Sequence, residues 1–345
     1  MIALYLGLLI FSFLLTSVLV VPFINFLYKV KFLRKFQTTT DAEGQRTKIF
    51  DKFHNVKAGT PVGGGVLVII VTLLLYLILL PLLSYLGVYI TTAFQIREEL
   101  NILFFTFVSF AFLGLYDDIM KFFGFEKTGL FGLRIRHKFF IQWVLALTVS
   151  SLMYFNLRID IFNTPFIGVL HLGPFFIPFA AFIIVAFANA FNITDGLDGL
   201  SSGLLMICLF AFWFLAHSVL DTPLSIFIAL WIGSLIAFLY FNIYPARVFL
   251  GDVGALSFGA TLAVVGLLLG KTVGLLVIGG VFVIEGGTSL IQLLSKRILK
   301  KKAFAVAPFH LWLQNKGWEE PKIVMRAWLA GIMLAILGLW LSYIY

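Results

Sequence analysis

Three short groups of polar residues stand out in a chain that is otherwise apolar, and their residue types suit metal and phosphate chemistry. The first group is the adjacent pair Asp117 and Asp118. The second is the segment 189–200, which carries two Asn, two Asp and two Gly among its first eleven residues. The third is 241–254, in which Asp252 lies between two glycines. Carboxylate oxygens are hard ligands that suit Mg²⁺, and Mg²⁺ in turn bridges substrate phosphates.

Each group taken alone also has a purely structural interpretation. Asp117 and Asp118 would form a solvated helix end, and Asp198 or Asp252 would be the N-cap of a following helix. On the functional interpretation, adjacent carboxylates raise each other's pKa unless a cation satisfies them, which favours a metal or phosphate site with one Asp as base. Asp195 and Asp198 are three residues apart and would share a face if the segment were helical.

Long apolar helices must position these groups. The chain has 345 residues, of which 61% are hydrophobic and 12% charged, whereas soluble domains contain about 45–50% apolar and about 25% charged residues. The mean hydropathy of +1.06 and the continuous apolar runs exclude a soluble protein and disfavour a β-barrel. A membrane-spanning helix needs about 20 apolar residues. We therefore predict an all-α, polytopic membrane protein, a single domain over 1–345, with spans at 2–28, 62–87, 99–116, 138–156, 172–190, 199–219, 224–243, 254–270, 274–294 and 322–344.

The basic residues indicate how these spans are oriented. Alternating spans place five linkers on one side of the membrane, namely 29–61, 117–137, 191–198, 244–253 and 295–321. With the flanking span ends, that side holds 22 of the 25 Lys and Arg residues, and only Arg97, Arg158 and Lys271 fall on the other. Because basic residues are retained in the cytoplasm during insertion, we predict that these linkers are cytoplasmic and both termini outside. The net charge of +9 is then an orientation signal, not a nucleic-acid patch.

All three carboxylate groups fall in linkers, or at span ends, on the predicted cytoplasmic side. Lys57, Lys121, Lys138 and Arg247 lie on the same side and are candidates to hold diphosphate oxygens. This combination predicts phosphoryl transfer with a metal-bound, highly charged substrate. Since the site would lie at the bilayer surface, a lipid is a suitable second reactant.

At these residues the chain resembles the polyprenyl-phosphate N-acetylhexosamine-1-phosphate transferases, the glycosyltransferase 4 family. The matching motifs are Lys57 to Gly64, the pair Asp117-Asp118, Asn189 to Leu200 and Phe241 to Gly254. Weaker matches are Glu285 with Gln292, Ala307 to His310, and Lys316 to Trp318. Order and spacing are kept from the first linker to the last span, so the resemblance covers nearly the whole chain.

The resemblance implies a ten-span, usually dimeric enzyme of the bacterial cytoplasmic membrane whose active site faces the cytoplasm. It is strongest to the members that transfer phospho-N-acetylmuramoyl-pentapeptide from UDP to undecaprenyl phosphate. The implied products are lipid I and UMP, and the implied cofactor is Mg²⁺. The implied partners are therefore a UDP-activated amino sugar, undecaprenyl phosphate and membrane lipid, with no nucleic acid.

The resemblance also assigns roles to individual residues. Asp252 would be the metal ligand, and Asp117 and Asp118 would act at the lipid-phosphate and metal site, with Asp117 as the candidate base. Contacts to the nucleotide sugar and uridine carry over to Asn192, Asp195, Gly196, Leu197 and Asp198, and Phe249 would pack on the uracil. Lys57 and Lys138 would bind phosphate or substrate, and Gln292 and His310 would lie near the sugar.

One departure from the family pattern leaves the sugar open. The family usually has three consecutive histidines where this chain has His310-Leu311-Trp312, so a second hypothesis is a sister enzyme that uses UDP-N-acetylglucosamine or another UDP-sugar. A third hypothesis is a transporter or lipid flippase. Transporters carry charged or broken-helix features near the bilayer midplane. The predicted spans are mostly uninterrupted and the acids lie at one face, which disfavours this class. Glu285 is an intramembrane acid, either functional or hydrogen-bonded to a neighbouring helix.

Overall fold

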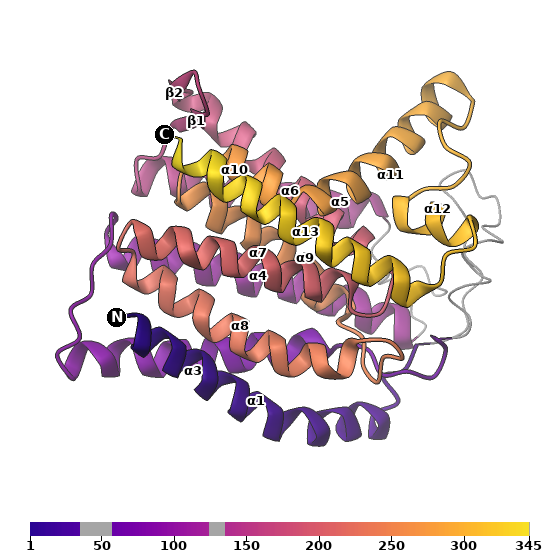
Figure 1. Ribbon diagram of the computed structural model, residues 1–345, viewed down its shortest axis with the longest axis horizontal. Helices are drawn as coiled ribbons and strands as arrows, with labels where there is room; N and C mark the ends of the chain where they lie inside the picture. Colours follow the sequence, from indigo (N-terminus) through magenta and orange to yellow (C-terminus); the bar gives the residue numbers. More distant parts are fainter. Residues whose placement is uncertain (35–56, 124–134, 345) are drawn as a thin grey trace.

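The structure is a bundle of long helices that run roughly parallel to the longest axis of the molecule (Figure 1). This computed structural model describes residues 1–34, 57–123 and 135–344, so most of the basic segment 29–57, with Lys127 and Arg134, lies outside the described residues. Within these ranges, nine helices are long and apolar enough to cross a membrane. They are α1 (Ile2–Lys29), α3 (Gly64–Tyr85), α4 (Ile96–Phe123), α5 (Ile135–Asn156), α6 (Phe176–Thr194), α7 (Leu200–Ser218), α8 (Thr222–Asn242), α9 (Gly251–Leu268) and α13 (Glu320–Tyr343). The helical, polytopic membrane fold predicted from composition is confirmed.

The ninth predicted span differs from the expectation. The structure has two helices in place of one continuous helix over 274–294, α10 (Thr272–Ile278) and α11 (Gly280–Leu299), bent by 81° relative to each other. The bend lies at two successive glycines, which are weak helix formers. A Cβ at Gly279 would lie 2.7 Å from the ring of Phe187, so the break also allows close packing on α6. Beyond it, α11 leaves the bundle (Figure 1) and buries only Phe282 and Glu285.

Helix α9 lies at the centre of the bundle, and glycines bring its neighbours close. A Cβ at Gly114 of α4 would be 2.1 Å from the backbone oxygen of Asp252. A Cβ at Gly65 of α3 would be 2.5 Å from the Cα of Gly254. Membrane helices associate closely through such small residues. The predicted carboxylate groups on α4 and α9 are therefore held together by backbone-to-backbone packing.

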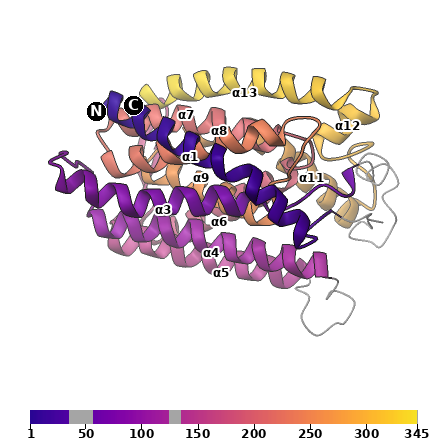
Figure 2. The same cartoon turned by 90° about the horizontal axis from the view of Figure 1, so that it is seen from below.

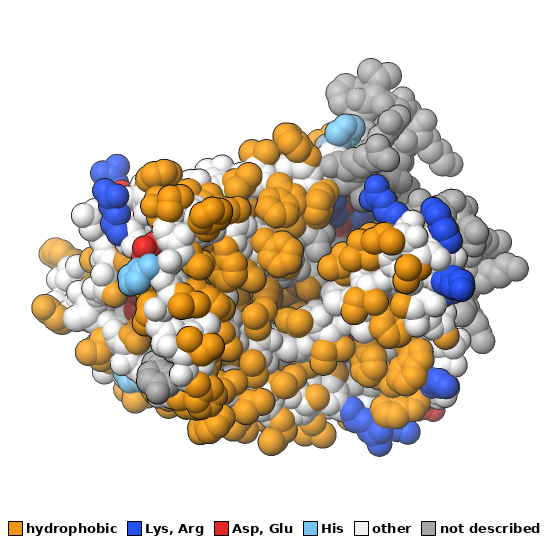
Figure 3. Space-filling view, turned by 90° about the horizontal axis from the view of Figure 1, so that it is seen from above, with side chains coloured by type: hydrophobic (Ala, Val, Ile, Leu, Met, Phe, Trp, Pro, Cys, Tyr) orange, Lys and Arg blue, Asp and Glu red, His pale blue; other side chains and the backbone are white. Residues whose placement is uncertain are grey.

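The two ends of the bundle have different contents. Both chain termini lie at one end, here called the terminal end, together with a hairpin of β1 (Ile161–Thr164) and β2 (Gly168–His171) and the short helix η3 (Gly173–Phe175) (Figures 1 and 2). The hairpin is antiparallel and was not predicted. The opposite end, here called the carboxylate end, holds α12 (Phe309–Asn315) and the ends of α4 and α6. Lys and Arg side chains gather there beside the apolar surface (Figure 3).

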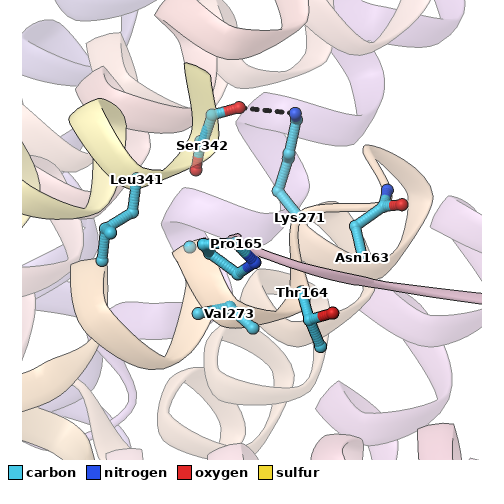
Figure 4. A pocket seen from close by; sticks show the side chains of 8 residues that line it. Asn163, Thr164, Pro165, Lys271, Val273, Leu341 and Ser342 are labelled. Atoms are coloured by element: carbon cyan, nitrogen blue, oxygen red, sulfur yellow. Dashed lines mark hydrogen bonds between the residues drawn. The ribbon is translucent and has the colours of Figure 1, made fainter. Parts of the chain in front are cut away.

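A small cavity at the terminal end has a structural explanation. The Lys271 ammonium group donates a hydrogen bond of 2.6 Å to the carbonyl oxygen of Ser342, near the end of α13 (Figure 4). Asn163 of β1 donates to the carbonyl oxygen of Gly270 at 2.8 Å. A cation favours the negative end of a helix dipole. These contacts tie the hairpin and α13 to the α9–α10 turn, far from the carboxylate end.

Candidate active site

The central feature of the carboxylate end is a cluster of two carboxylates and two ammonium groups from three helices. The Lys138 ammonium of α5 lies 2.5 Å from an oxygen of Asp117 on α4 and 2.6 Å from an oxygen of Asp252 on α9. The Lys121 ammonium contacts the same two oxygens at 2.9 and 2.7 Å. The paired charges compensate each other in a place with little water, where unpaired charges are costly. Two of the three predicted carboxylate groups therefore meet directly.

Asp117 and Asp118 do not end their helix as predicted, because α4 continues to Phe123. The helix tolerates Asp117 there because Lys121 lies one turn later on the same face. Asp118 points differently and is only 3% exposed. Its carboxylate accepts a hydrogen bond of 3.0 Å from the backbone N–H of Val253 in the first turn of α9. The N-cap residue of α9, Leu250, has no side chain that can make a capping hydrogen bond, and Asp118 of α4 supplies that interaction instead.

Asp252 is not the N-cap of its helix, which was its structural interpretation. Helix α9 begins at Gly251 with Leu250 as N-cap, and Asp252 lies inside the first turn. One of its oxygens faces the two lysines, and the other accepts a hydrogen bond of 3.0 Å from the Asn192 side chain of α6. The Asp252 carboxylate is therefore the point at which α4, α5, α6 and α9 meet.

The second polar segment is helical only up to Thr194, and residues 195–199 form a turn. Helix α6 ends at Thr194, and Gly199 takes the N-cap position of α7 with φ of +75°, so Asp198 is not that cap. Asp195 accepts a hydrogen bond from the Ser201 hydroxyl at 2.5 Å. Asp198 accepts from the backbone N–H of Ala246 at 2.9 Å. The two acids therefore have different partners and do not act as one face.

Lys57 joins this turn to the start of α13, which is distant along the chain. Its ammonium lies 2.6 Å from Asp198 and 2.5 Å from Glu320 at the start of α13, and 3.4 Å from the Gly196 carbonyl oxygen. Glu320 also accepts a hydrogen bond of 2.6 Å from the backbone N–H of Asp198. Glu320 was absent from the predicted site. It follows the weak match at Lys316 to Trp318, which was the available signal.

Phe249, which the resemblance places on the uracil, lies beside Arg34 and Lys57. The Arg34 guanidinium is 5.2 Å and the Lys57 ammonium 5.9 Å from the centre of its ring. The backbone N–H of Phe249 donates to the carbonyl oxygen of Pro61 at 2.8 Å, which places motif 57–64 alongside motif 241–254. Arg34 was missed because nothing distinguished it among the many basic residues of its linker.

The pKa values of the titratable groups in this region reflect two opposing effects, the loss of hydration on burial and the charges of nearby groups. Loss of hydration raises the pKa of Asp195 to about 7, although the Ser201 hydroxyl and the positive charges of Arg34 and Lys57 oppose that shift. Loss of hydration also lowers the pKa of Arg34, against the attraction of Asp195, Asp198 and Glu320. Asp195 is therefore a candidate proton-exchanging group near neutral pH.

His310 and Glu285 form a buried pair beside the turn, each 2% exposed. Glu285 accepts from the backbone N–H of His310 at 3.1 Å, and one of its oxygens lies 2.9 Å from the ring Nδ1. The ring Nε2 packs against Gly196, where a Cβ would be 2.7 Å away. Of the two interpretations of Glu285, the structure shows the hydrogen bond to a neighbouring helix, with His310 of α12 as the partner. His310 itself lies next to the turn, and its predicted place near the sugar stays a prediction.

Three further candidate residues make contacts within the protein that their predicted roles did not include. Gln292 uses both ends of its amide on the backbone of Phe304, at 3.0 and 2.8 Å, and so holds the loop after α11. Leu197 is 3% exposed and packs inward. Arg247, proposed to hold a diphosphate, is exposed and lies over the ring of Phe241 at 5.6 Å. Neither Gln292 nor Arg247 joins the carboxylate–lysine cluster.

Comparison with known proteins gives consistent matches. The model of "Glycosyl transferase family 4" matches residues 100–270. A phospho-N-acetylmuramoyl-pentapeptide-transferase of Aquifex aeolicus is 36% identical over 95% of this chain and 89% of its own length. Proteins of the same name from Borreliella burgdorferi and Caldanaerobacter subterraneus are each 34% identical, over 96% and 90% of this chain and 92% and 90% of theirs.

Proposed function

Since this chain belongs to glycosyl transferase family 4, we propose that it transfers phospho-N-acetylmuramoyl-pentapeptide from UDP to undecaprenyl phosphate, releasing UMP and forming lipid I. The observation that carries the proposal is the cluster of Asp117, Asp252, Lys121 and Lys138 beside the turn 195–199. The cluster can compensate the charge of a diphosphate, and the turn beside it can hold a nucleotide. The family and the names of the relatives support the choice of substrates.

At the acceptor, the phosphate of the lipid is already a nucleophile, so the protein has to align it and compensate charge. We assign Asp117 as the group that takes the proton from the lipid phosphate, as the family resemblance implies, since its carboxylate lies in the last two turns of a membrane helix. Lys121 and Lys138 then have three ammonium hydrogens each to share between carboxylate and phosphate oxygens. Charge-assisted contacts of this kind are the strong ones.

The carboxylates fit the Mg²⁺ ion that the family resemblance implies. Among the described residues no group of three or more His, Cys, Asp or Glu is placed to hold a metal. Mg²⁺ does not require such a cage, because it keeps several waters and takes one or two carboxylates together with substrate phosphates. Asp252, with Asp117 beside it, supplies that donor set. When bound there, Mg²⁺ would neutralise the diphosphate of the donor and stabilise the departing UMP.

The nucleotide end of the donor is assigned to the turn 195–199 and its neighbours. Asp198 and Lys57 offer a paired acceptor and donor to a base or ribose, and the ring of Phe249 offers a face for a pyrimidine. Leu197 and Gly196 form the backbone of the turn. Two residues of α6 and its end lie between the turn and the carboxylate–lysine cluster. They are Asn192, which contacts Asp252, and Asp195, three residues later.

The sugar end is assigned to His310, whose ring lies against Gly196 and is oriented by Glu285. Leu311 is buried, and the ring of Trp312 stacks on Phe309 with centroids 5.7 Å apart. The two positions that usually hold histidine are thus used for packing here. This observation favours the second candidate, a family member that accepts a different UDP-N-acetylhexosamine such as UDP-N-acetylglucosamine.

We place the carboxylate end on the cytoplasmic side of the bacterial inner membrane, because most of the basic residues lie there and the nucleotide donor is a cytoplasmic molecule. We also propose a homodimer, by analogy with the family. The bent pair α10–α11 is a broken-helix feature of the kind found in transporters. The carboxylate cluster does not lie at the bend, however, so the transporter hypothesis gains no binding site from it.

The decisive measurement is UMP release by the purified protein with undecaprenyl phosphate and Mg²⁺. UDP-N-acetylmuramoyl-pentapeptide and UDP-N-acetylglucosamine are compared as donors, each with and without EDTA. We expect release with the first donor and its loss when the metal is chelated. Release with the second donor alone would assign the chain to the sister reaction, and no release with any UDP-sugar would overturn the transferase proposal.

A further inference from the structure

A polar contact lies between α5 and α6, one helical turn away from the cluster. The Asn189 side chain donates a hydrogen bond of 2.6 Å to the side-chain oxygen of Gln142. The same amide nitrogen also donates to the carbonyl oxygen of Val185 at 2.8 Å, which fixes its orientation on α6. Gln142 is only 1% exposed, so the contact is shielded from water. Neither residue belongs to the cluster itself.

The pair is in register with the residues that reach Asp252. Gln142 is four residues after Lys138 on α5, and Asn189 is three residues before Asn192 on α6, spacings that place each pair on one helix face. Lys138 contacts one oxygen of Asp252 at 2.6 Å, and Asn192 contacts the other at 3.0 Å. The two helices are therefore linked twice, by the amide pair and by the Asp252 carboxylate.

Helix α5 is one of the less buried helices of the bundle, so its polar contacts contribute more to fixing its register. Only 28% of its apolar window is buried, compared with 94% for α9. Lys138 lies near the start of α5, on a long side chain whose reach depends on how that helix is shifted and rotated. Between apolar helix surfaces, packing alone permits small shifts, whereas a hydrogen bond between side chains selects one register.

We propose that Gln142 is a positioning residue, which holds α5 against α6 through Asn189 so that Lys138 meets Asp252 and Asp117. Only the expected effect of Gln142 on turnover rests on the proposed function. Its structural part, the placement of the Lys138 ammonium, is independent of which substrate the enzyme uses.

The test measures how fast each lysine of the purified, full-length protein reacts with an amine-acylating reagent, followed by mass spectrometry. The variant is Gln142→Leu, which removes the acceptor and keeps the side-chain bulk. We expect acylation of Lys138 to become about 5- to 30-fold faster, the factor that corresponds to losing one interhelical hydrogen bond of about 1–2 kcal/mol. Lys121, on α4, is the internal reference and should change less than about twofold.

Two controls separate positioning from general loosening. Thr148→Val removes a hydroxyl that bonds only within α5, to the carbonyl oxygen of Val144, and should leave both labelling rates unchanged. The exchanged pair Gln142→Asn with Asn189→Gln keeps the combined reach of the two amides and should restore slow labelling of Lys138. Should Gln142→Leu fail to fold, the single change Gln142→Asn, one methylene too short, provides the same measurement.

Unchanged labelling of Lys138 in a folded Gln142 variant would overturn the proposal, and so would an equal rise for Lys138 and Lys121. UMP release is then measured on the same samples and should fall about 5- to 30-fold in Gln142→Leu and recover in the exchanged pair. If the wild-type protein released no UMP, the proposed function would fail while the labelling result still decided the role of Gln142.

Discussion

At the scale of single residues, the Asp252 carboxylate is the group on which the candidate site depends. Each of its oxygens has partners, Lys121 and Lys138 on one side and Asn192 on the other. On the proposed function, this carboxylate balances two ammonium groups in the absence of substrate and would bind Mg²⁺ in its presence. Its charge matters more than its shape.

Replacing Asp252 by Asn tests that charge. The variant retains a side chain of the same size but leaves two partly buried ammonium groups with one carboxylate instead of two. We expect UMP release to fall by at least about 100-fold, the usual effect of removing one electrostatic contact to a transition state. Asp160→Asn, at the terminal end, is the matched control and should be close to wild type. A folded Asp252→Asn protein with near-normal turnover would contradict the proposed role.

The raised pKa of Asp195 predicts a pH-dependent stability. Its pKa is about 7 in the folded chain and about 4 in an unfolded one, so the folded state binds the proton more tightly. The stabilisation is complete below about pH 4 and is lost as the pH rises through about 7. Relative to Asp195→Asn, the wild-type melting temperature should therefore decline between about pH 5 and pH 7, measured in EDTA without substrate. Parallel pH curves for the two proteins would show that Asp195 does not titrate there.

At the scale of elements, the site exists because three helices approach more closely than ordinary side chains would permit. The contact of α4 with α9 depends on Gly114, and the contact of α3 with α9 depends on Gly65 and Gly254. Asp118 adds a capping bond across the first of these contacts. The position of Asp252 relative to Asp117 is thus set by backbone packing and not by the carboxylates themselves, whose charges repel.

Gly114→Ala tests this packing. The added Cβ would lie 2.1 Å from the backbone oxygen of Asp252, so α4 and α9 must separate. We expect a loss of about 1–3 kcal/mol in stability from overpacking and a fall in UMP release of about 10- to 100-fold from misplacement of the cluster. Gly7→Ala on α1 has no heavy atom within 4 Å of the new Cβ and is the control. Equal behaviour of the two variants in thermal unfolding and turnover would contradict this account.

At the scale of the whole molecule, the distribution of charge separates the two ends. Ion pairs among the described residues concentrate at the carboxylate end, whereas the terminal end carries Arg97, Arg158 and Lys271. The apolar surface between them suits the hydrocarbon of a bilayer (Figure 3). The basic residues predict the orientation of the molecule across the membrane.

The single Cys208 makes a measurement of this orientation direct. It is buried, so Cys208→Ser provides a background without reactive thiols. In this background, Val169→Cys on the exposed hairpin and Lys316→Cys at the carboxylate end are each treated with a membrane-impermeant thiol reagent on intact cells. We expect labelling of the first at once and of the second only after permeabilisation. The opposite pattern would invert the proposed orientation.

Much of this arrangement could be predicted from the sequence. Nine of the ten apolar runs became single helices, and the motifs at 57–64, 117–118, 189–200 and 241–254 gathered at one end. Apolar runs of this length have one solution in lipid, since every backbone polar group must be paired within the segment. Because the spans alternate in direction, every second linker lies on the same side of the bundle. The membrane-spanning runs and the end of the bundle that holds the candidate site therefore follow from local composition.

The partners of each side chain could not be predicted in this way. The sequence suggested that Asp117 ends a helix and that Asp195 and Asp198 share a face, and the structure shows neither. Glu320 and Gln142 entered the site only through contacts with Lys57 and Asn189, more than 40 residues distant along the chain. The break at Gly279 arises where α6 packs against it. Hydropathy records how much of a helix is apolar, whereas these contacts depend on the rotation and depth of each helix, which only packing against its neighbours decides.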